Sequence, residues 1–535
     1  MTDDLDEAIR LRAEGNTAKA LESVKRTLVT APADFSGLQL IGVMHCEVED
    51  FANGLPYLYW ASCAESDNPH LWLNIALGHR RLGQHSLALS IAQRSLLLSP
   101  DNAVMYLAVV RYVASRDIEI GLMAKSLRIC SWAIAIGPDL FEVAFHFGSV
   151  WKWLGNPDVA SGYYERAVAL SPDAVVPLIA LADVLAESAR FSSSQIIYER
   201  ACRLQPDNHD ALYHLSLVQL RKGDFENGWV NYDHRWLAAV GASHLKSART
   251  LRSLRPEYKG VGSGKCVLLW AEQGVGDEIM FGRLIGEFLP RCRQVLVQID
   301  SRLIGLFSRA FPSVQFFALE QDVPIDLYDE QLPLGSLGRI LRSKAQSFIG
   351  NGGGFLAALP ELASKVRRDI NVDRREFLVG LCWRAANPEN RRVRSIPLEA
   401  IMAALGDERL RFLNLQYGNV DAEINLLKPE RRQRLLRHPN IDLTKDLEGV
   451  AGLIASCDLV ISVGNTVAHL AGALNKKCWV LLPHVAGWRW LHGHQRCAWY
   501  DSVRLFRQDA RGHWNSVLAA VNDELQQELS ARRQP

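Results

Sequence analysis

The chain has 535 residues, of which 48% are hydrophobic and 22% are charged, and its formal net charge is +1. This length predicts several domains, each with its own core. The near-neutral balance gives no bulk attraction to nucleic acid or to an anionic membrane, and no apolar stretch is long enough for a membrane span. The acidic start, Met1–Glu7, lacks the order of a signal peptide. Ten scattered cysteines without a Cys-x-x-Cys pair fit reduced thiols, so we expect a cytoplasmic protein.

Prolines recur at a fixed interval in the first half of the chain. Pro138, Pro172 and Pro206 are each followed by Asp and stand 34 residues apart, and Pro32 precedes Pro100 by 68, which is twice 34. A period of 34 residues is typical of tetratricopeptide repeats, in which each repeat is a pair of helices. The interval from Pro100 to Pro138 is 38 residues, and we interpret the excess as an insertion near Ser115–Glu119.

The frame 141–174 shows why such a pair packs. Small residues, Gly148 and Ala160, stand where the two helices must touch. The seam between the helices is filled by Phe147, Trp151, Tyr164 and Ala167. About seven repeats fit into residues 1–240, with atypical first and last repeats as caps. The concave face of this solenoid is expected to bind a partner protein, and the alternatives are self-association or a rigid spacer.

The pattern changes after a linker at residues 241–260. Short apolar runs then alternate with helical segments, which predicts a doubly wound α/β sheet. The strands that we expect are 266–270, 294–299, 314–317, 377–383, 411–416, 459–463 and 478–482. They form two units, which predicts two Rossmann-like lobes: 261–375, and 376–535 with a C-terminal helix.

Three polar turns, 271–278, 384–394 and 464–469, each follow the carboxyl end of a predicted strand. Ligands of open parallel sheets bind beyond these ends, so the turns are expected to converge on one cleft. The turn 464–469 leads into a helix whose first backbone N–H groups are suited to a phosphate. Taken alone, it is also an ordinary strand-to-helix turn.

Three segments resemble the heptosyltransferase-like group of GT-B glycosyltransferases: AEQGVGDE at 271–278, RRVRSIPL at 391–398 and VGNTVAHLAGAL at 463–474. The resemblance covers roughly residues 260–525. With repeats in front of it, the chain is similar in architecture to bacterial protein O-glycosyltransferases, including those that modify flagellin. The resemblance implies that the lobe 261–375 takes the acceptor and the lobe 376–535 a nucleotide-sugar. It implies transfer to Ser or Thr of a protein without a metal or other cofactor.

The resemblance places the catalytic base at Asp277, in a Gly-x-Gly-Asp turn where Gly274 and Gly276 let substrate approach the backbone. The alternative is that Asp277 only caps a helix running from about Glu278 to Leu289. Glu272 and Glu278 are alternate bases, and the neighbouring Gln273 is a candidate for substrate binding.

The resemblance also places the phosphate contacts in the turn after the strand 459–463. The candidates there are Asn465, Thr466, Val467 and His469, although His469 is equally well explained as a packed helix residue. Arg394 is the arginine of its cluster that we expect to turn inward onto phosphate, where a solvated face is the alternative. Gln416, with Tyr417 and Gly418, is expected to cover the nucleotide base.

The segment Trp488–Trp490 is a candidate for shaping the sugar pocket, and core aromatics are the alternative. Two positions depart from the family pattern. Relatives usually carry Asp where Gly464 stands and often His where Ala271 stands. These departures motivate a second hypothesis, in which the chain is a repeat scaffold or chaperone with an inactive glycosyltransferase-like domain. A homo-oligomer and an enzyme acting on lipid-linked or polysaccharide acceptors are further alternatives.

Overall fold

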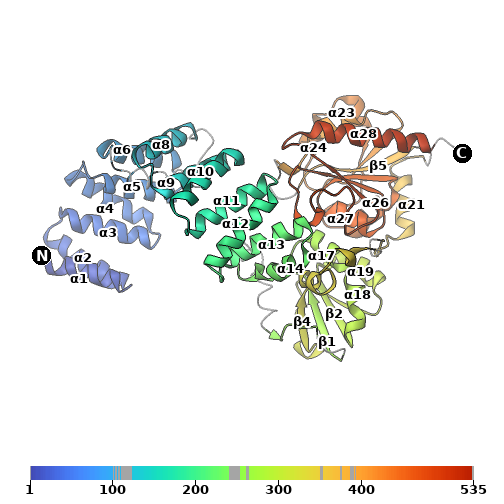
Figure 1. Cartoon of the computed structure of the whole chain (residues 1–535), viewed down its shortest axis with the longest axis horizontal. Helices are drawn as coiled ribbons and strands as arrows, with labels where there is room; N and C mark the ends of the chain where they lie inside the picture. The colour runs from blue at the N-terminus through green and yellow to red at the C-terminus, as the bar shows by residue number, and fades with distance from the viewer. Residues whose placement is uncertain are drawn as a thin grey trace. The chain divides into compact units, whose positions relative to one another are not determined.

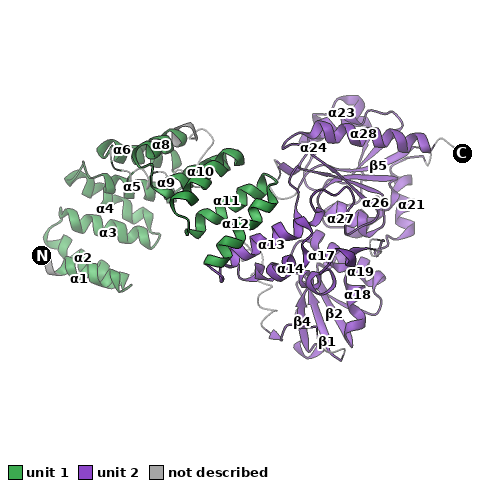
Figure 2. Cartoon of the chain, in the orientation of Figure 1, with its two compact units in different colours: residues 1–204 green, residues 205–535 purple. Residues whose placement is uncertain are grey.

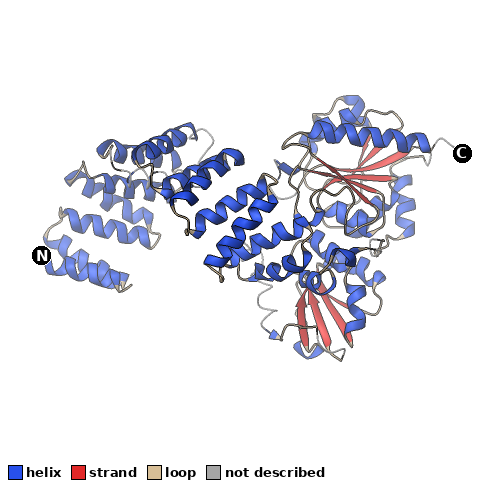
Figure 3. Ribbon diagram, in the orientation of Figure 1, coloured by secondary structure: helices blue, strands red, loops and turns tan. Residues whose placement is uncertain are grey.

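The structure is a computed structural model that describes residues 2–100, 102, 105, 109, 123–239, 254–260, 264–349, 353–373, 376–385, 391 and 393–532. The chain divides into two compact units, Met1–Leu204 and Gln205–Pro535 (Figure 2). The described part of the first unit is helical, whereas the second combines helices with two parallel sheets (Figure 3). None of the described helices has both the length and the apolar character that a membrane crossing requires.

The first unit is a stack of antiparallel helix pairs, the architecture that the proline period predicts (Figure 1). The helices α9 and α11 begin 34 residues apart, at Phe141 and Val175. The insertion predicted near Ser115–Glu119 lies outside the described residues. The described helices of this unit are α1 (Thr2–Ala13), α2 (Thr17–Thr30), α3 (Phe35–Glu47), α4 (Phe51–Ala64), α5 (Pro69–Arg81), α6 (His85–Leu98), α8 (Met123–Ile136), α9 (Phe141–Trp153), α10 (Pro157–Leu170), α11 (Val175–Glu187) and α12 (Phe191–Leu204).

Small residues set the spacing within each pair. A Cβ added to Gly148 of α9 would lie 2.8 Å from the ring of Tyr164 on α10. In an earlier pair, a Cβ on Gly54 of α4 would lie 2.8 Å from the carbonyl oxygen of Gly42 on α3. Because real Cβ atoms do not approach this closely, only glycine allows these helices to pack at this distance. The predicted repeat solenoid is confirmed.

The second unit begins with one more helix pair, α13 (His209–Lys222) and α14 (Phe225–Tyr232), followed by the short helix η2 (Asp233–Trp236). This pair keeps the 34-residue spacing, but its core is shared with the α/β part that follows. The indole Nε1 of Trp229 donates a hydrogen bond to the carbonyl oxygen of Arg342 at 2.8 Å, and the Trp229 ring packs against Trp488. The sequence assigns the pair to the solenoid, and its contacts place it in the second unit.

The first α/β lobe is built on a four-stranded parallel sheet with the order β3-β2-β1-β4. The helix expected from Glu278 to Leu289 begins earlier, at Val275, and is interrupted after Gly282. The elements of this lobe are β1 (Cys266–Trp270), α17 (Val275–Gly282), α18 (Ile285–Phe288), η3 (Leu289–Arg291), β2 (Gln294–Ile299), η4 (Ser301–Leu303), α19 (Ile304–Ala310), β3 (Gln315–Ala318), η5 (Ile325–Leu327), β4 (Glu330–Pro333), η6 (Leu334–Ser336), α20 (Leu337–Leu341) and η7 (Ala345–Phe348). The next helix, α21 (Pro360–Asp369), packs on α26 of the second lobe.

The second lobe has six parallel strands in the order β10-β9-β8-β5-β6-β7. Numbered from its own first strand this is 6-5-4-1-2-3, the doubly wound Rossmann order, with its switch point between β5 and β8. In Figure 1, α23 and α28 lie on one face of this sheet and α26 and α27 on the other. The elements are β5 (Phe377–Cys382), α23 (Leu398–Ala404), β6 (Leu410–Asn414), α24 (Asp421–Asn425), α25 (Pro429–Gln433), β7 (Leu435–Leu436), α26 (Leu447–Ser456), β8 (Leu459–Val463), α27 (Thr466–Ala473), β9 (Cys478–Leu482), η8 (Trp488–Trp490), β10 (Val503–Arg507) and α28 (Trp514–Ala531).

The two lobes contact each other directly and belong to the same compact unit. Arg309 of α19 forms an ion pair with Glu448 of α26 at 2.5 Å. Nearby, Nη1 of Arg302 donates to the carbonyl oxygen of Thr444 at 2.6 Å. At the other end of the interface α17 packs on α27, which brings the turn after β1 next to the turn after β8.

Glu278 of α17 gives a prediction about stability and pH. Its side chain is buried, it accepts a hydrogen bond from the backbone N–H of Asp300 at 2.8 Å, and burial raises its pKa to about 8. Between about pH 4.5 and 8 the folded protein therefore holds a proton that the unfolded chain has lost, so the unfolding free energy falls as the pH rises. Glu278→Gln keeps the acceptor and is expected to remove this loss, which is on the order of 1 kcal/mol per pH unit. Urea unfolding at pH 5, 7 and 9 measures how the unfolding free energy changes with pH. The control is Glu430→Gln, an exposed position on α25. An equal change with pH in the wild type and both variants would contradict the prediction.

Candidate functional site

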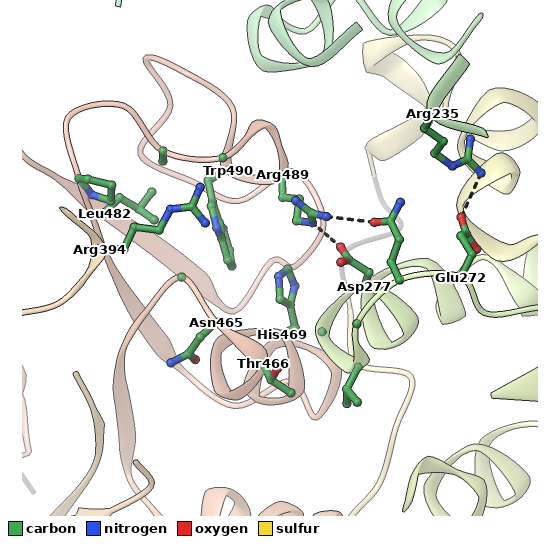
Figure 4. Close-up of a pocket in the computed structure, with 18 of the residues that line it drawn as sticks. Arg235, Glu272, Asp277, Arg394, Asn465, Thr466, His469, Leu482, Arg489 and Trp490 are labelled. Atoms are coloured by element: carbon green, nitrogen blue, oxygen red, sulfur yellow. Dashed lines mark hydrogen bonds and ion pairs between the residues drawn. The ribbon is translucent and has the colours of Figure 1, made fainter. Parts of the chain in front are cut away.

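A cavity of about 740 Å³ opens between the two lobes at the switch-point edge of the larger sheet (Figure 4). Its walls come from the turn between β1 and α17, the turn between β8 and α27, and the loop that follows β9. The helix α13 and η2 complete it through Tyr213 and Arg235. This volume is in the range of sites that hold a small molecule or cofactor.

Most of the residues predicted from the sequence lie around this cavity. They are Gln273, Gly274, Gly276, Asp277, Arg394, Asn465, Thr466 and His469, whereas Val467 and Gln416 do not line it. The three polar turns thus supply residues to one cavity, although residues 386–390 and 392 of the middle turn lie outside the described part of the chain. The described residues contain no group of three or more His, Cys, Asp or Glu side chains arranged to hold a metal ion.

Asp277 does not cap the helix that carries it. The cap position of α17 is Gly274, and Asp277 lies within the first turn. Its carboxylate instead forms an ion pair with Arg489, whose Nε donates to Oδ1 (Figure 4). The sequence separates these residues by 212 positions. The carboxylate lies at the cavity wall and is about one fifth exposed, so a ligand can reach it.

The two alternate bases are engaged elsewhere. Glu272 is buried in an ion pair with Arg235, at 3.0 Å between Nη2 and Oε1, and it also accepts from the backbone N–H of Gly335. Glu278 is buried against Asp300 and does not line the cavity. Neither carboxylate is free to take a proton from a bound acceptor. Of these three carboxylates, Asp277 is the one that a ligand in the cavity can reach.

The two glycines before Asp277 have different surroundings. A Cβ on Gly274 would meet open space. A Cβ on Gly276 would lie 3.3 Å from His469 and 3.4 Å from the hydroxyl oxygen of Thr466. Gly274 fits the expectation that substrate approaches the backbone here, whereas for Gly276 that expectation needs correction. The lack of a side chain at Gly276 allows α17 to pack closely against α27.

The turn between β8 and α27 presents Thr466 to the cavity. Asn465 caps α27, because its Oδ1 accepts from the backbone N–H of Val467 at 3.0 Å, while its Nδ2 donates to the carbonyl oxygen of Arg384 at 3.4 Å. The side-chain amide of Asn465 and the backbone N–H of Val467 are therefore occupied, and Val467 itself is buried. Thr466 makes no side-chain hydrogen bond with another described residue. Between the side chains of Asn465 and Thr466, the Thr466 hydroxyl is therefore the donor available to a ligand.

His469 is both a packed helix residue and part of the cavity wall. It is 4% exposed, its ring stacks on Trp490 with centroids 4.8 Å apart, and its Nδ1 lies 3.3 Å from the hydroxyl oxygen of Tyr500. Burial, and then the positive charge of Arg489, lower the pKa of His469 to about 3. The ring is therefore neutral near pH 7. It can make a hydrogen bond but brings no positive charge and no acidic proton to a phosphate.

Arg394 lies across Trp490 from Arg489 and faces the same cavity (Figure 4). Burial and the charge of Arg489 lower its pKa, although an arginine stays charged at any ordinary pH. No described residue forms an ion pair with it. Around this cavity Arg489 is balanced by Asp277 and Arg235 by Glu272, so Arg394 leaves one positive charge in excess. The cavity is electrostatically suited to an anion.

Gln416 has a structural role at the carboxyl ends of β5 and β6. Its Oε1 accepts from the backbone N–H groups of Trp383 at 3.0 Å and Arg384 at 2.7 Å, and its Nε2 donates to the carbonyl oxygen of Tyr417. The side chain is 1% exposed and borders a separate hollow of about 400 Å³. Gln416 therefore does not line the main cavity, and its expected place beside the nucleotide base stays a prediction.

Sequence reasoning missed three features of this cavity. Arg489 was considered only for shaping a pocket, although its neighbours in the sequence, Trp488 and Trp490, mark the segment as unusual. Tyr213 and Arg235 belong to the helices before the α/β part, and no local signal connects them with a distant turn. Gly464, named above as a departure from the resembling family, has no room for a side chain, because a Cβ there would lie 2.7 Å from Nε1 of Trp490.

Comparison with known proteins gives distant likenesses. No protein-family model matches the chain. Protein FlbA of Caulobacter vibrioides is 23% identical in an alignment of 504 residues that covers 84% of this chain and 83% of that protein. Among solved structures, a tetratricopeptide repeat protein from Parabacteroides merdae is 13% identical with a TM-score of 0.37, covering 43% of this chain and 90% of that one. The C-terminal part of a repeat protein from Cytophaga hutchinsonii is 13% identical with a TM-score of 0.35, covering 44% and 95%.

Proposed function

We propose that the chain is a glycosyltransferase that moves a sugar from a nucleotide-sugar to a Ser or Thr hydroxyl of a protein acceptor. The observation that carries the proposal is the cavity itself. It joins the Asp277 carboxylate from the first lobe with Thr466 and Arg394 from the second. An acid side chain and an anion-binding wall on opposite sides of one cavity are what transfer from a sugar phosphate needs.

In this reaction the acceptor hydroxyl oxygen attacks the anomeric carbon of the donor, and the bond from that carbon to the phosphate oxygen breaks. Asp277 takes the hydroxyl proton. The departing phosphate keeps the bonding electron pair, and Arg394 and the Thr466 hydroxyl stabilise its charge. Neutral His469 is suited to a hydrogen bond with the phosphate or the sugar. The family resemblance implies that no metal is needed for this chemistry.

The helical repeats are proposed to recruit the acceptor, and flagellin is a candidate because similar architectures modify it. Support within the second unit comes from α13, a helix of repeat type that lines the cavity through Tyr213. An acceptor segment lying along this helix would reach the Asp277 side of the cavity. The test is to incubate the pure protein with UDP-, GDP-, ADP- and CMP-sugars and candidate acceptors, and to weigh the intact acceptor by mass spectrometry. No mass gain with any donor would overturn the proposal.

Arg394→Ala is expected to weaken nucleotide binding about 10- to 100-fold, because a charge-assisted contact in a partly buried site contributes about 1.5–3 kcal/mol. A thermal-shift panel with UDP, GDP, ADP and CMP first identifies the nucleotide, and titration calorimetry then measures the affinity. The matched control is Arg391→Ala, an exposed arginine three residues away that does not line the cavity. Equal losses in both variants would show that Arg394 has no specific contact with the ligand.

A second candidate function is a non-catalytic scaffold or chaperone whose cavity no longer transfers sugar. The Asp277–Arg489 ion pair favours it, as does the indole of Trp490, which fills the space beside Gly464 where resembling enzymes carry Asp. The two functions differ in a cellular test. The scaffold function is the correct one if cells with Asp277→Ala behave like the wild type while cells with disrupted repeats lose the protein's function.

A further inference from the structure

Arg489 connects the two lobes at the centre of the cavity. It lies in η8 of the second lobe, and its guanidinium bonds two residues of the first lobe. Nε donates to the carboxylate of Asp277, and Nη2 donates to Oε1 of Gln273 at 3.2 Å (Figure 4). Its Nη1 donates to none of the described residues. About one quarter of the side chain is exposed, and it lines the cavity, so a bound ligand can contact it.

The backbone is held in place on both sides of Arg489 by contacts of Trp488 and Leu491. Before it, Trp488 packs among the aromatic rings of Trp229 and Tyr232, and the guanidinium lies 4.8 Å from the centre of the Trp488 ring. After it, Leu491 has a φ of +44°, a backbone conformation that side chains rarely adopt. Nη2 of Arg507 donates to the Leu491 carbonyl oxygen at 2.6 Å and holds this turn. A fixed backbone leaves the side chain of Arg489 as the part that can change partner.

The charge arrangement around Arg489 is incomplete. Two cations, Arg394 and Arg489, face the same cavity, and burial together with the positive charge of Arg489 lowers the pKa of Arg394. Asp277 neutralises one of them, and no described residue neutralises the other. Arg394, Arg489 and Thr466 all line the cavity, so an anion bound there would be attracted to both guanidinium groups and could accept a hydrogen bond from the Thr466 hydroxyl.

We propose that Arg489 is a phosphate-binding residue of the donor site and that it exchanges Asp277 for the donor's diphosphate when the donor binds. This inference rests on the proposed function. In the free protein the ion pair with Arg489 keeps the Asp277 carboxylate from accepting a proton. When the donor phosphate takes the guanidinium, the carboxylate becomes free to accept the acceptor's proton. Arg489 thereby makes the base depend on a bound donor, so the acceptor's proton can be taken only while the donor is in place.

A double-mutant cycle on binding alone tests this exchange. The probes are the nucleoside diphosphate that most stabilises the wild type, chosen from UDP, GDP and ADP, and inorganic pyrophosphate. Both are titrated calorimetrically into the full chain as wild type, Asp277→Asn, Arg489→Met and the double variant. Because Asp277 competes for Arg489, Asp277→Asn is expected to tighten binding about 3- to 10-fold. Arg489→Met is expected to weaken it about tenfold or more.

The double variant is decisive. If exchange is correct, Asp277→Asn changes the affinity less than about twofold in the Arg489→Met background, since no guanidinium is left to compete for. An equal gain in both backgrounds would mean simple charge repulsion and would overturn the inference, as would weaker binding by Asp277→Asn. Arg489→Lys, which keeps the charge on a flexible stem, replaces Arg489→Met if that variant fails to fold, and its expected loss is smaller.

The outcomes also separate the inference from the proposed function. Nucleoside diphosphate binding without coupling between Asp277 and Arg489 would leave the donor site intact and overturn the exchange alone. Coupling measured with pyrophosphate, without any nucleotide binding, would support the exchange and count against a nucleotide-sugar donor. Binding of neither probe would overturn both.

Discussion

Asp277→Asn is expected to reduce sugar transfer about 10²- to 10⁴-fold, the range that a positioned general base contributes. The amide has nearly the shape of the carboxylate but cannot accept the proton. The same substitution removes the negative charge that holds Arg489, so nucleotide binding is expected to remain and to become tighter. A loss of turnover together with stronger nucleotide binding is a result that general unfolding cannot produce.

The measurement is single-turnover transfer to the acceptor, followed by intact mass, with nucleotide affinity determined on the same protein. Asp322→Asn, an exposed carboxylate of the same lobe, is the matched control and is expected to have no effect on either quantity. If Asp277→Asn retains more than about a tenth of the wild-type transfer rate, Asp277 is not the base. The scaffold function would then gain support.

The buried strands could be predicted because their residues are uniformly apolar. Cys266–Trp270, Leu459–Val463 and Cys478–Leu482 are each five consecutive buried residues, and the predicted bounds match the observed ones. The strand β4, Glu330–Pro333, escaped prediction because it contains Glu, Gln and Pro. Its Gln331 is buried, and its Oε1 accepts a hydrogen bond from the Trp270 indole at 2.7 Å. This contact joins residues far apart in the chain, so no local sequence pattern indicates it.

The candidate site likewise contains residues that the sequence predicted and residues that only the structure revealed. Asp277 and Thr466 were located in turns that follow predicted strands, because parallel strands bring their carboxyl ends to one edge, and the role of Asp277 came from the family resemblance. The residues that lie opposite them in the cavity were not predicted from the sequence to contact them. Arg489 and Tyr213 reach the cavity from a later loop and an earlier helix, and only the folded chain brings them to Asp277. Sequence motifs located the centre of the cavity, and tertiary packing decided which of its polar groups are already paired.

Arg235→Met is expected to lower the unfolding free energy by about 3–5 kcal/mol at pH 7, because it leaves a buried carboxylate without its cation. The Arg235 side chain is 1% exposed and that of Glu272 2%, and their ion pair at 3.0 Å joins η2 to the turn after β1. Burial already raises the pKa of Glu272, and Arg235 opposes that shift. Without Arg235 the pKa of Glu272 in the folded protein would rise further above its unfolded value, so the deficit is expected to grow once the pH passes the pKa of Glu272 in the wild type. Urea unfolding at several pH values measures it.

The double variant Arg235→Met/Glu272→Gln shows whether the loss comes from the unpaired charge. Replacing both members of a buried pair is often nearly neutral, so the double variant is expected to recover a large part of the stability and to lose the pH dependence. Arg293→Met, which breaks an exposed pair with Asp329 at 3.8 Å, is the control and is expected to change little. If the single variant loses less than about 1 kcal/mol, the Arg235–Glu272 pair does not hold η2 against the first lobe. The wall of the cavity that carries Tyr213 would then have to be held by the aromatic contacts of Trp229 and Tyr232.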